Sequence, residues 1–491
     1  MLSSKRFHTS NAPASAVAVL LLACIVNVVI AFTPAPSKII SNLSYKHDNT
    51  LMPTFTKMMA SPSAAVSTKP YFADYTCSDK DDDSSSSSVA STTNINNLIG
   101  SGKTAIVAGA TGYIGRAVVR ECVSRGYNTI SLVRDASKAA LDEALGGSSL
   151  VECDVQNVEE VQRLFSEIAS GKHAFSTSSG SEANTAPLPV DIVCSCLASP
   201  SGIESEVYAI DYQATLNLLN AGRDPSVSAR HFVLLSAFCC RNPLLKLQQA
   251  KLKFEDKLHE QKDMTYSIVR PTAFFKSVSG QYESIMQGNS YVLFGDGAVT
   301  YCNPIAETDL ATYMCDSAID EKQWGRILNV GGPDEPLSNK MLAEMMFRVI
   351  DKPAKFVYVP TEIFDWSIGM IEWIAKTFPS QKWEDVLETA KIGKYYAVED
   401  MLTTEEEEKF GSIKMMDHFE KIAREGQDPF TPVRATAVIS KAMEALPAIS
   451  ISVPVGLGLL SKPGLVENAV ASSPLSDVPL LIAGLSDNIF S

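Results

Sequence analysis

The chain has 491 residues, of which 45% are hydrophobic, and its 42 basic and 56 acidic residues give a formal charge of -14. This length exceeds one ordinary domain and the composition can form a sizeable core. The acidic balance excludes a protein that binds nucleic acid through a basic face. The ten cysteines lack the paired spacing of a zinc site and the density of a disulfide framework, so we predict no metal site and a reducing compartment.

The first 96 residues have the features of a targeting leader followed by a linker. Lys5 and Arg6 precede an uncharged, largely apolar run at 16–31, which is shorter than the roughly 20 residues of a membrane-spanning helix. We therefore predict a removable signal peptide over 1–32, and a retained anchor is the alternative. Residues 33–96 add a segment rich in Ser, Thr and Lys, then an Asp/Ser-rich linker. Together they resemble the bipartite leader of proteins imported into plastids of secondary origin.

An apolar run at 105–108 is followed by three glycines spaced three apart, in the stretch Gly109-Ala-Thr-Gly-Tyr-Ile-Gly115. The pattern predicts a strand, a tight turn and a helix over 113–124. Gly112 would let the backbone approach a pyrophosphate, and the N-terminus of the helix would face it. Glycine turns also occur without a ligand, so the motif alone leaves both interpretations open. The predicted cofactor contacts in this turn are Gly109, Thr111, Gly112, Tyr113, Ile114 and Gly115.

The end of the second predicted strand, at 128–133, favours NADP(H) over NAD(H). Arg134 follows this strand 19 residues after Gly115, and Lys138 lies four residues further on. A site for NAD places Asp or Glu near this position to hold the ribose hydroxyls, whereas a cation suits the 2′-phosphate of NADPH. A solvated loop is the alternative. We therefore predict NADPH as the cofactor, with Arg134 and Lys138 at its 2′-phosphate.

Strand and helix patterns alternate from residue 100 to about 330, which predicts an α/β fold with a doubly wound parallel Rossmann sheet. A stretch rich in Ser, Gly, Thr and Pro at 170–189 predicts a surface insertion. Further strands are expected at 150–153, 191–196, 231–236, 265–270 and 327–330. Further helices are expected from 158 onward, at 207–221 and at 246–259.

Residues at three strand ends are expected beside the cofactor, because ligands bind outside the carboxyl ends of parallel strands. Asp154 and Val155 follow the third strand, where Asp154 fits either the adenine edge or a cap for the next helix. Leu197 and Ala198 follow the fourth strand, and Pro271 follows the sixth.

The glycine-rich turn, Arg134 and Pro271-Thr272 resemble the atypical branch of the short-chain dehydrogenase/reductase superfamily, whose NmrA-like members bind NAD(P) on a Rossmann fold. Within this branch the chain resembles the divinyl chlorophyllide 8-vinyl-reductase family of chloroplasts, over about 100–430. The resemblance implies NADPH-dependent reduction of the 8-vinyl group of divinyl chlorophyllide a or protochlorophyllide a to ethyl, in chlorophyll biosynthesis in the plastid. It rests on the runs 234–238, 244–255 and 269–277, on Gly331-Gly-Pro and on the region around Trp366.

One position departs from the superfamily's usual catalytic pair, a Tyr with a Lys four residues later. Lys251 matches the Lys, but the Tyr position holds Leu247. A carbonyl reductase needs an acidic O–H to protonate an alkoxide, and leucine has none. Reduction of a vinyl group conjugated to a tetrapyrrole forms no alkoxide, because the charge spreads into the macrocycle. The resemblance thus implies a catalytic role for Lys251, and a solvated residue on an amphipathic helix is the alternative.

A tetrapyrrole substrate is flat and apolar, and Phe274 and Phe275 after the sixth strand would give it an aromatic wall. The alternative is that both rings belong to the core. Two other functions stay open at this point. One is an alkene reductase of the isoflavone-reductase type, and the other is a non-catalytic plastid assembly or regulatory protein that has lost the Tyr.

Beyond the sheet we expect a smaller, mainly helical substrate-side subdomain. A β-hairpin is predicted over 291–294 and 299–303, around Gly295-Asp296-Gly297. Residues 336–430 are predicted to be mostly helical, with Thr404 capping a helix that starts at Glu405–Glu408.

The predicted organisation has three parts after the leader. They are an NADP-binding Rossmann domain at 97–290, the substrate-side subdomain at 291–435, from which strand 327–330 returns to the sheet, and a tail at 436–491. The tail has two apolar runs, at 453–460 and 478–485, which proline and glycine interrupt. Neither run is long enough to span a bilayer. The tail fits either a disordered extension or a peripheral contact with plastid membrane lipid.

Overall fold

The structure, a computed structural model, describes residues 99–172 and 187–427. All of these residues belong to one compact unit. The expected leader and linker, most of the expected insertion and the tail at 436–491 lie outside them. Within the described part of the chain, no helix is both long enough and apolar enough to cross a membrane.

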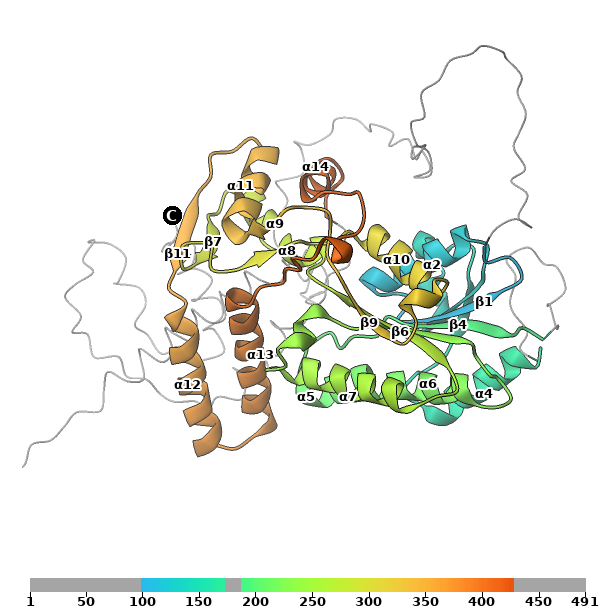
Figure 1. Ribbon diagram of the computed structural model, residues 1–491. Helices are drawn as coiled ribbons and strands as arrows, with labels where there is room; N and C mark the ends of the chain where they lie inside the picture. The colour runs from blue at the N-terminus through green and yellow to red at the C-terminus, as the bar shows by residue number, and fades with distance from the viewer. Residues whose placement is uncertain (1–98, 173–186, 428–491) are drawn as a thin grey trace, which may run out of the picture. The chain divides into compact units, whose positions relative to one another are not determined.

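A seven-stranded parallel sheet forms the centre of the fold, in the order β3-β2-β1-β4-β5-β6-β9 (Figure 1). The predicted Rossmann sheet is confirmed, and each predicted strand end lies within one residue of the observed one. The strands read as continuous apolar runs because both faces of the sheet are covered. They are β1 (Thr104–Ala108), β2 (Asn128–Val133), β3 (Ser149–Glu152), β4 (Val190–Ser195), β5 (His231–Leu235), β6 (Thr265–Pro271) and β9 (Arg326–Val330).

Helices cover both faces of this sheet (Figure 1). On one face lie α2 (Tyr113–Ser124) and α10 (Glu307–Ser317), which share a core with Ala105 and Val107 of β1. On the other face lie α4 (Val158–Ala169), α6 (Thr215–Arg223) and α7 (Lys246–Glu260), which share a core with Ile106 and Ala108. Alternate side chains of β1 therefore pack into two separate cores, one on each face of the sheet.

The helix expected at 207–221 is longer and less regular than predicted. It begins as α5 (Glu204–Val207), widens into the π-helical segment η3 (Tyr208–Ala214) and continues as α6. A π segment inserts an extra residue per turn, which the 3.6-residue period of the apolar pattern does not anticipate. The segment carries Asp211, which is 2% exposed.

The β-hairpin expected at 291–303 is wrong. The first strand, β7 (Tyr291–Phe294), pairs in parallel with β11 (Phe356–Val359), and β8 (Tyr301–Cys302) pairs antiparallel with β10 (Leu337–Ser338). Gly295 leaves β7 with a φ of +57° and donates its N–H to the Val359 carbonyl at 2.9 Å. A glycine-rich turn predicts a change of chain direction, but the packing of the apolar strands selects their partners.

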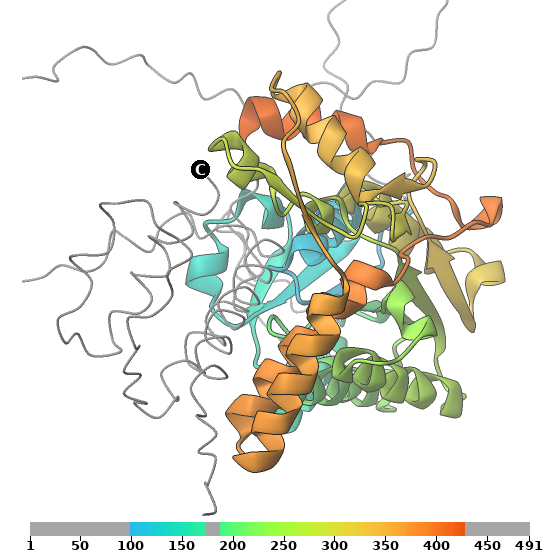
Figure 2. The same ribbon diagram turned by 90° about the vertical axis from the view of Figure 1, so that its left-hand side faces the viewer.

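The mainly helical character predicted for residues 336–430 is confirmed over their described part, 336–427. Four α-helices occur in it: α11 (Asn339–Val349), α12 (Glu362–Thr377), α13 (Gln381–Val398) and α14 (Met415–Glu425). α12 and α13 form a helical hairpin, with α13 between α12 and the helices under the sheet (Figures 1 and 2). Short segments connect the remaining elements: α3 (Ala136–Ala139), η2 (Glu143–Leu145), η4 (Phe238–Arg241), α8 (Phe275–Val278), α9 (Tyr282–Met286), η5 (Glu321–Gln323) and η6 (Glu406–Glu408).

The helix expected to start at Glu405–Glu408 is also wrong, because only the single 3₁₀ turn η6 forms there and no side chain caps it. The hydroxyl of Thr404 lies 3.4 Å from Oε1 of Glu405 instead. The carboxylate of Glu408 accepts hydrogen bonds from Thr403 and from Asn329 on β9. These bonds tie the turn to the edge of the sheet in place of a longer helix.

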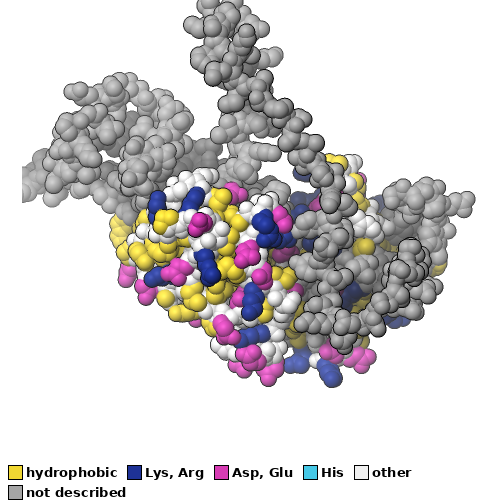
Figure 3. Space-filling model, turned by 90° about the horizontal axis from the view of Figure 1, so that it is seen from above, with side chains coloured by type: hydrophobic (Ala, Val, Ile, Leu, Met, Phe, Trp, Pro, Cys, Tyr) yellow, Lys and Arg dark blue, Asp and Glu magenta, His cyan; other side chains and the backbone are white. Residues whose placement is uncertain are grey.

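The surface carries side chains of both charges. On the face shown in Figure 3, Lys and Arg side chains are interspersed with Asp and Glu, and hydrophobic side chains lie between them. A nucleic-acid backbone would instead require Lys and Arg to cluster.

Candidate functional site

The glycine-rich turn forms a tight cradle at the carboxyl end of β1. Gly109 has a φ of +76°, which residues with a Cβ rarely adopt, and a Cβ there would lie 2.6 Å from the Cys196 carbonyl oxygen. A Cβ on Gly115 would overlap the carbonyl oxygen of Gly109. The packing of α2 against β1 and β4 therefore requires glycine at both positions.

Helix α2 begins at this cradle without a capping side chain. Its N-cap is Gly112, where a Cβ would lie 3.1 Å from the Gly109 carbonyl oxygen, and the cap makes no side-chain hydrogen bond. The first N–H groups of the helix have no helical partner, and the helix dipole adds a partial positive charge there. Such a cradle fits the pyrophosphate of a dinucleotide.

The side chains of the turn have different surroundings. Ile114 is 4% exposed and belongs to the core between the sheet, α2 and α10, whereas Thr111 is exposed. The hydroxyl of Tyr113 donates a hydrogen bond to Oε2 of Glu307 at 2.7 Å, and its ring meets Phe274 edge-on, with centroids 6.2 Å apart. Tyr113 thus links the turn to the start of α10 and to the segment after β6.

Arg134 and Lys138 are both exposed beyond the end of β2. Nearby carboxylates are engaged in local hydrogen bonds: Asp135 accepts the N–H of Lys138 as the cap of α3, and Glu152 accepts the N–H of Ala136, each at 2.9 Å. Both carboxylates therefore accept a backbone N–H of the segment that carries the two exposed cations.

Asp154 and Val155 follow β3 as expected from the sequence. The alternative that Asp154 caps α4 is wrong, because Asn157 is the cap and accepts the N–H of Glu160. Asp154 is exposed, and its carboxylate accepts the N–H of Gln156 at 3.1 Å.

A buried ion pair contacts the loop that follows β4. Lys251 is 5% exposed, and its Nζ lies 2.9 Å from Oδ1 of Asp211. The other oxygen of Asp211 accepts the N–H of Ser199, two residues beyond Leu197, at 2.9 Å. Lys251 also donates to the Leu235 carbonyl at the end of β5, at 3.3 Å. The alternative of a solvated Lys251 is therefore wrong, since the ammonium joins the ends of two neighbouring strands.

The electrostatics of this pair keep the ammonium charged. Burial alone would lower the pKa of Lys251, but the charge and hydrogen bond of Asp211 outweigh burial and raise it. Sequence analysis missed Asp211, although a signal was present. Asp211 shares a buried helical face with Ala214, Thr215 and Leu218, and an acidic residue on such a face requires a polar partner.

Helix α13 packs against the start of α7 and against η4, which follows β5. Glu388 accepts the N–H of Lys246 at 2.7 Å, and the Tyr395 hydroxyl donates to the Cys239 carbonyl at 3.0 Å. The Cys239 thiol is buried, as expected for a small hydrophobic residue, but its surroundings are polar. A hydrogen bond with Cys240 lowers the pKa of Cys239, and bonds with Gln248 and other polar neighbours add to this effect against burial.

The two candidate substrate aromatics have different environments. Phe275 is 1% exposed, lies in the core formed by α9, α11 and α14, and packs on His418 with centroids 5.2 Å apart. Phe274 is half-buried beside Tyr113. Pro271, which ends β6, is buried. Of the two aromatics, Phe274 is the one whose ring borders the glycine cradle.

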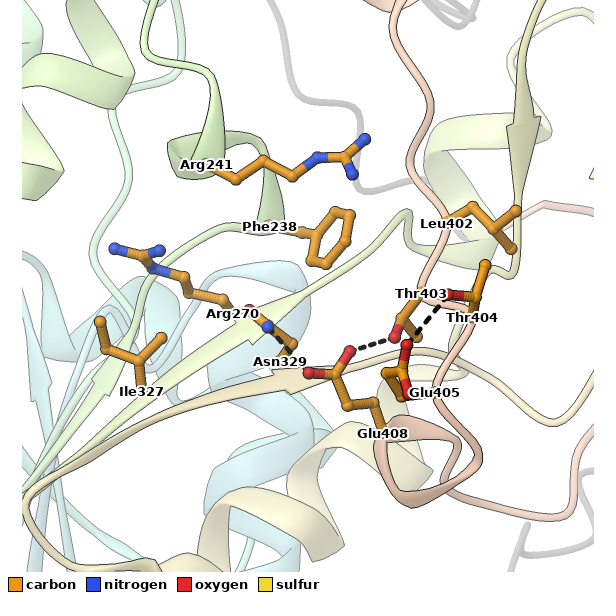
Figure 4. A pocket seen from close by; sticks show the side chains of 10 residues that line it. All are labelled: Phe238, Arg241, Arg270, Ile327, Asn329, Leu402, Thr403, Thr404, Glu405 and Glu408. Carbon is orange, nitrogen blue, oxygen red and sulfur yellow. Dashed lines mark hydrogen bonds between the residues drawn. The ribbon is translucent and has the colours of Figure 1, made fainter.

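A separate pocket of about 290 Å³ lies between the β6–β9 edge and the segment 402–408 (Figure 4). Its charged wall includes Arg270, whose guanidinium pairs with buried Glu255, and its floor includes Asn329, which donates to Glu408 at 2.9 Å. None of the residues predicted for cofactor or substrate lines it, so it is distinct from the glycine cradle. Among the described residues, no group of three or more His, Cys, Asp or Glu side chains is placed to hold a metal ion.

Residues 109–318 match the model of a family described as NAD(P)H-binding. The fold, the cradle and this match define a protein of the Rossmann class that binds a nicotinamide cofactor. The chain is 39% identical over 341 residues to the chloroplastic divinyl chlorophyllide a 8-vinyl-reductase of Cucumis sativus. The alignment covers 65% of this chain and 76% of the relative. The corresponding protein of Arabidopsis thaliana is 39% identical over 359 residues, or 69% and 81% of the two chains. The chain belongs to the divinyl chlorophyllide a 8-vinyl-reductase family.

Both relatives are chloroplast proteins, which supports a plastid location for this chain. Among solved structures, the complex of leucoanthocyanidin reductase with NADPH from Vitis vinifera is similar, with a TM-score of 0.45 and 16% identity, over 65% of this chain and 98% of that one. A likeness at this level says nothing about substrate.

Proposed function

We propose that the protein uses NADPH to reduce the 8-vinyl group of divinyl chlorophyllide a, or of its protochlorophyllide precursor, to an ethyl group. The observation that carries this proposal is the 39% identity to reductases of that name, which extends over about two thirds of the chain. That length is greater than the 109–318 stretch that matches the general NAD(P)H-binding family, so the similarity is not limited to that stretch.

The glycine cradle and the two cations after β2 would hold the cofactor. The uncapped start of α2 suits the pyrophosphate, and the exposed Arg134 and Lys138 suit the 2′-phosphate that distinguishes NADPH from NADH. When bound, NADPH supplies the hydride. Asp154 and Val155 would border the adenine, and Leu197, Ala198 and Pro271 would border the rest of the cofactor at the strand ends.

The remaining residues would orient the reactants and keep water out. Lys251 holds the loop that follows β4 through Asp211, so we assign it the alignment of the nicotinamide end of the site. Leu247, at the position of the superfamily's Tyr, adds a hydrocarbon surface where a vinyl group needs no phenolic donor. Phe274 is our candidate for the ring that packs on the macrocycle, with Phe275 behind it in the core.

The test is an anaerobic incubation of the protein with divinyl chlorophyllide a and NADPH, followed by absorbance in the Soret region. Loss of the vinyl group shortens the conjugated system, so conversion shifts the Soret band to shorter wavelength. Absence of conversion together with measurable NADPH binding would instead support the assembly or regulatory role. Conversion of an isoflavone but not of the chlorophyllide would support the other alkene-reductase hypothesis.

For the leader, we propose a signal peptide over 1–32 followed by a plastid transit segment. It is supported by the cationic start, the short apolar run and the Ser- and Thr-rich stretch after it. Residues 1–96 fused to a fluorescent protein should reach the plastid in a cell with a secondary plastid, and a fusion lacking 1–32 should stay outside it. Plastid import of the shortened fusion would refute the two-part leader.

A further inference from the structure

Helix α13 covers the loops that follow β4 and β5. Glu388 and Tyr395 bond to the start of α7 and to η4. Ile392 lies against the loop after β4, since a Cβ on Gly202 would come within 2.7 Å of its Cδ1. The end of β4 in turn borders the glycine cradle, where the Cys196 carbonyl faces the turn. Ligands of a parallel sheet bind beyond these carboxyl ends, so α13 borders the region where substrate and cofactor would meet.

A thiol and a phenol meet under this helix. The Tyr396 hydroxyl on α13 donates to Sγ of Cys239 on η4, over 4.0 Å. Cys239 is 2% exposed, whereas Tyr396 is 41% exposed. The phenol therefore connects a buried sulfur with an accessible surface beyond the end of β5.

The surroundings of Cys239 favour a negative charge on its sulfur. A hydrogen bond with Cys240 has the largest effect on the thiol and exceeds the opposing effect of burial. Hydrogen bonds with Gln248 and Tyr396 and the positive charge of Lys251 add to it, and the pKa of the thiol falls from 9.0 to about 7. The charge of the sulfur and burial shift the phenol the other way, raising the pKa of Tyr396 well above its ordinary 10.0. The anion of this pair is therefore the thiolate.

The other thiol and phenol of the cluster do not ionise near neutral pH. The hydrogen bond with Cys239 and burial raise the pKa of Cys240, and burial raises that of Tyr395. The charged neighbours of the cluster are Lys251 and Glu255 on α7, Arg241 on η4 and Glu399 at the end of α13. Cys239 is thus the group of this cluster that can exchange a proton close to neutral pH.

Gln248 gives independent support for an anion here. Its side chain is fully buried, and its Oε1 accepts the N–H of Leu245 at 2.8 Å. Its Nε2 has no hydrogen-bond partner of ordinary length among the described residues. A buried donor without an acceptor destabilises a fold, so it indicates a group that accepts more strongly in another state. The thiolate of Cys239 is such an acceptor.

We propose that Tyr396, together with Cys239, delivers the proton that the vinyl group takes up after the hydride. This inference rests on the proposed function. No alkoxide forms in that reaction, so no donor is needed at the position of Leu247, but the second vinyl carbon must still receive a proton. Tyr396 is the catalytic residue in this proposal, and Cys239 acts through it.

The proton moves in two linked transfers. The O–H of Tyr396 gives its proton to the second vinyl carbon, and the electron pair delocalised in the macrocycle forms the new C–H bond. The S–H of Cys239 gives its proton to the phenol oxygen at the same time. The negative charge thus ends on the sulfur, where Lys251 and Gln248 stabilise it, and solvent reprotonates the thiolate before the next turnover.

The first test compares Tyr396→Phe with the wild type in the reduction of divinyl chlorophyllide a. The variant should keep its affinity for NADPH and its KM for the chlorophyllide, while kcat falls about a hundredfold, as expected for loss of a general acid. The matched control, Tyr358→Phe, removes a hydroxyl from a side chain that is 52% exposed on β11 and should behave like the wild type. Full activity of Tyr396→Phe would overturn this inference alone. No conversion by the wild type would overturn the proposed function as well.

The pH dependence of kcat tests the part played by Cys239. The thiol must carry its proton to act, so kcat of the wild type should be highest at low pH and fall as the pH rises through about 7. Serine keeps its proton over this range, so Cys239→Ser should have a lower kcat without that fall. The same fall in both proteins would contradict a role for the thiol.

A third measurement needs neither substrate nor turnover. The ultraviolet absorbance of the thiolate, taken as the difference between the wild type and Cys239→Ser, should titrate with a midpoint of about 7 in the full chain alone. Tyr396→Phe, compared with its own Cys239→Ser counterpart, lacks a hydrogen bond to the anion, so its midpoint should shift toward 9.0. An unshifted midpoint would show that phenol and thiol are not coupled and would overturn the relay, whatever the activity of the variant.

Discussion

Replacing Lys251 with methionine tests the buried ion pair that joins the loop after β4 to the end of β5. The Lys251 and Asp211 side chains are 7% and 0% exposed, so the substitution leaves a carboxylate buried without its cation. Breaking a buried pair in this way costs about 3–5 kcal/mol. Asp211 keeps the hydrogen bond from Ser199, which places the expected loss of stability near the lower end. A loss of this size in a domain of a few hundred residues lowers the melting temperature by about 5–10 °C.

The assay is a double-mutant cycle of Lys251→Met and Asp211→Asn, measured by urea denaturation. Asparagine can still accept the Ser199 N–H but leaves no buried charge, so the double variant should be about 2 kcal/mol more stable than the sum of the single effects predicts. Because the pKa of Lys251 is raised above its ordinary 10.5, this contribution is complete at neutral pH and is lost only as the pH rises through the raised pKa. Lys257→Met, on the exposed side of α7, is the control and should leave the melting temperature unchanged. Effects that add within about 0.5 kcal/mol would refute the pairing.

Three further predictions follow from other residues. Arg134→Asp should weaken NADPH binding relative to NADH by at least about tenfold in a fluorescence titration, since a charge-assisted bond is worth about 1.5–3 kcal/mol, and an unchanged preference would remove the 2′-phosphate role. Gly115→Ala should abolish NADPH binding or folding because its Cβ overlaps backbone, whereas Gly369→Ala, whose Cβ meets nothing within 4 Å, should stabilise α12 by about 0.5–1 kcal/mol. Burial lowers the pKa of His231 from 6.5 to about 4, so the unfolded chain takes up a proton first and stability should fall by about 3 kcal/mol between pH 6.5 and 4. His231→Gln should flatten that part of the urea midpoint plotted against pH, and an unchanged profile would contradict the assignment.

The parallel sheet could be predicted because each strand is a short apolar run whose role depends on local sequence. The glycine turn was predictable for the same reason, since Gly109 needs a left-handed φ and Gly115 needs the absence of a Cβ. The β7–β11 pairing could not be predicted, because Tyr291 and Phe356 are far apart in the chain and their pairing is decided by packing. Local turn signals therefore gave a wrong hairpin there.

The same distinction between local sequence and long-range contacts applies to the candidate site. Its loop residues after β1 and β2 were found from spacing, whereas the partner of Lys251 was not, because Asp211 lies 40 residues earlier in a π-helical segment. The environment of Phe275 was likewise out of reach, since its partner His418 comes from the last described helix. Sequence reasoning thus predicted the local geometry of the glycine turn and the exposed strand ends, and it missed contacts that depend on the tertiary fold.

The most direct test of the central claim follows the hydride itself. Divinyl chlorophyllide a would be incubated with the protein and NADPH deuterated at either face of the nicotinamide C4, and the product analysed by mass spectrometry and NMR. The account predicts that one of the two labelled cofactors places deuterium on the new 8-ethyl group. Formation of the ethyl product without deuterium from either cofactor, or no product despite bound NADPH, would contradict it.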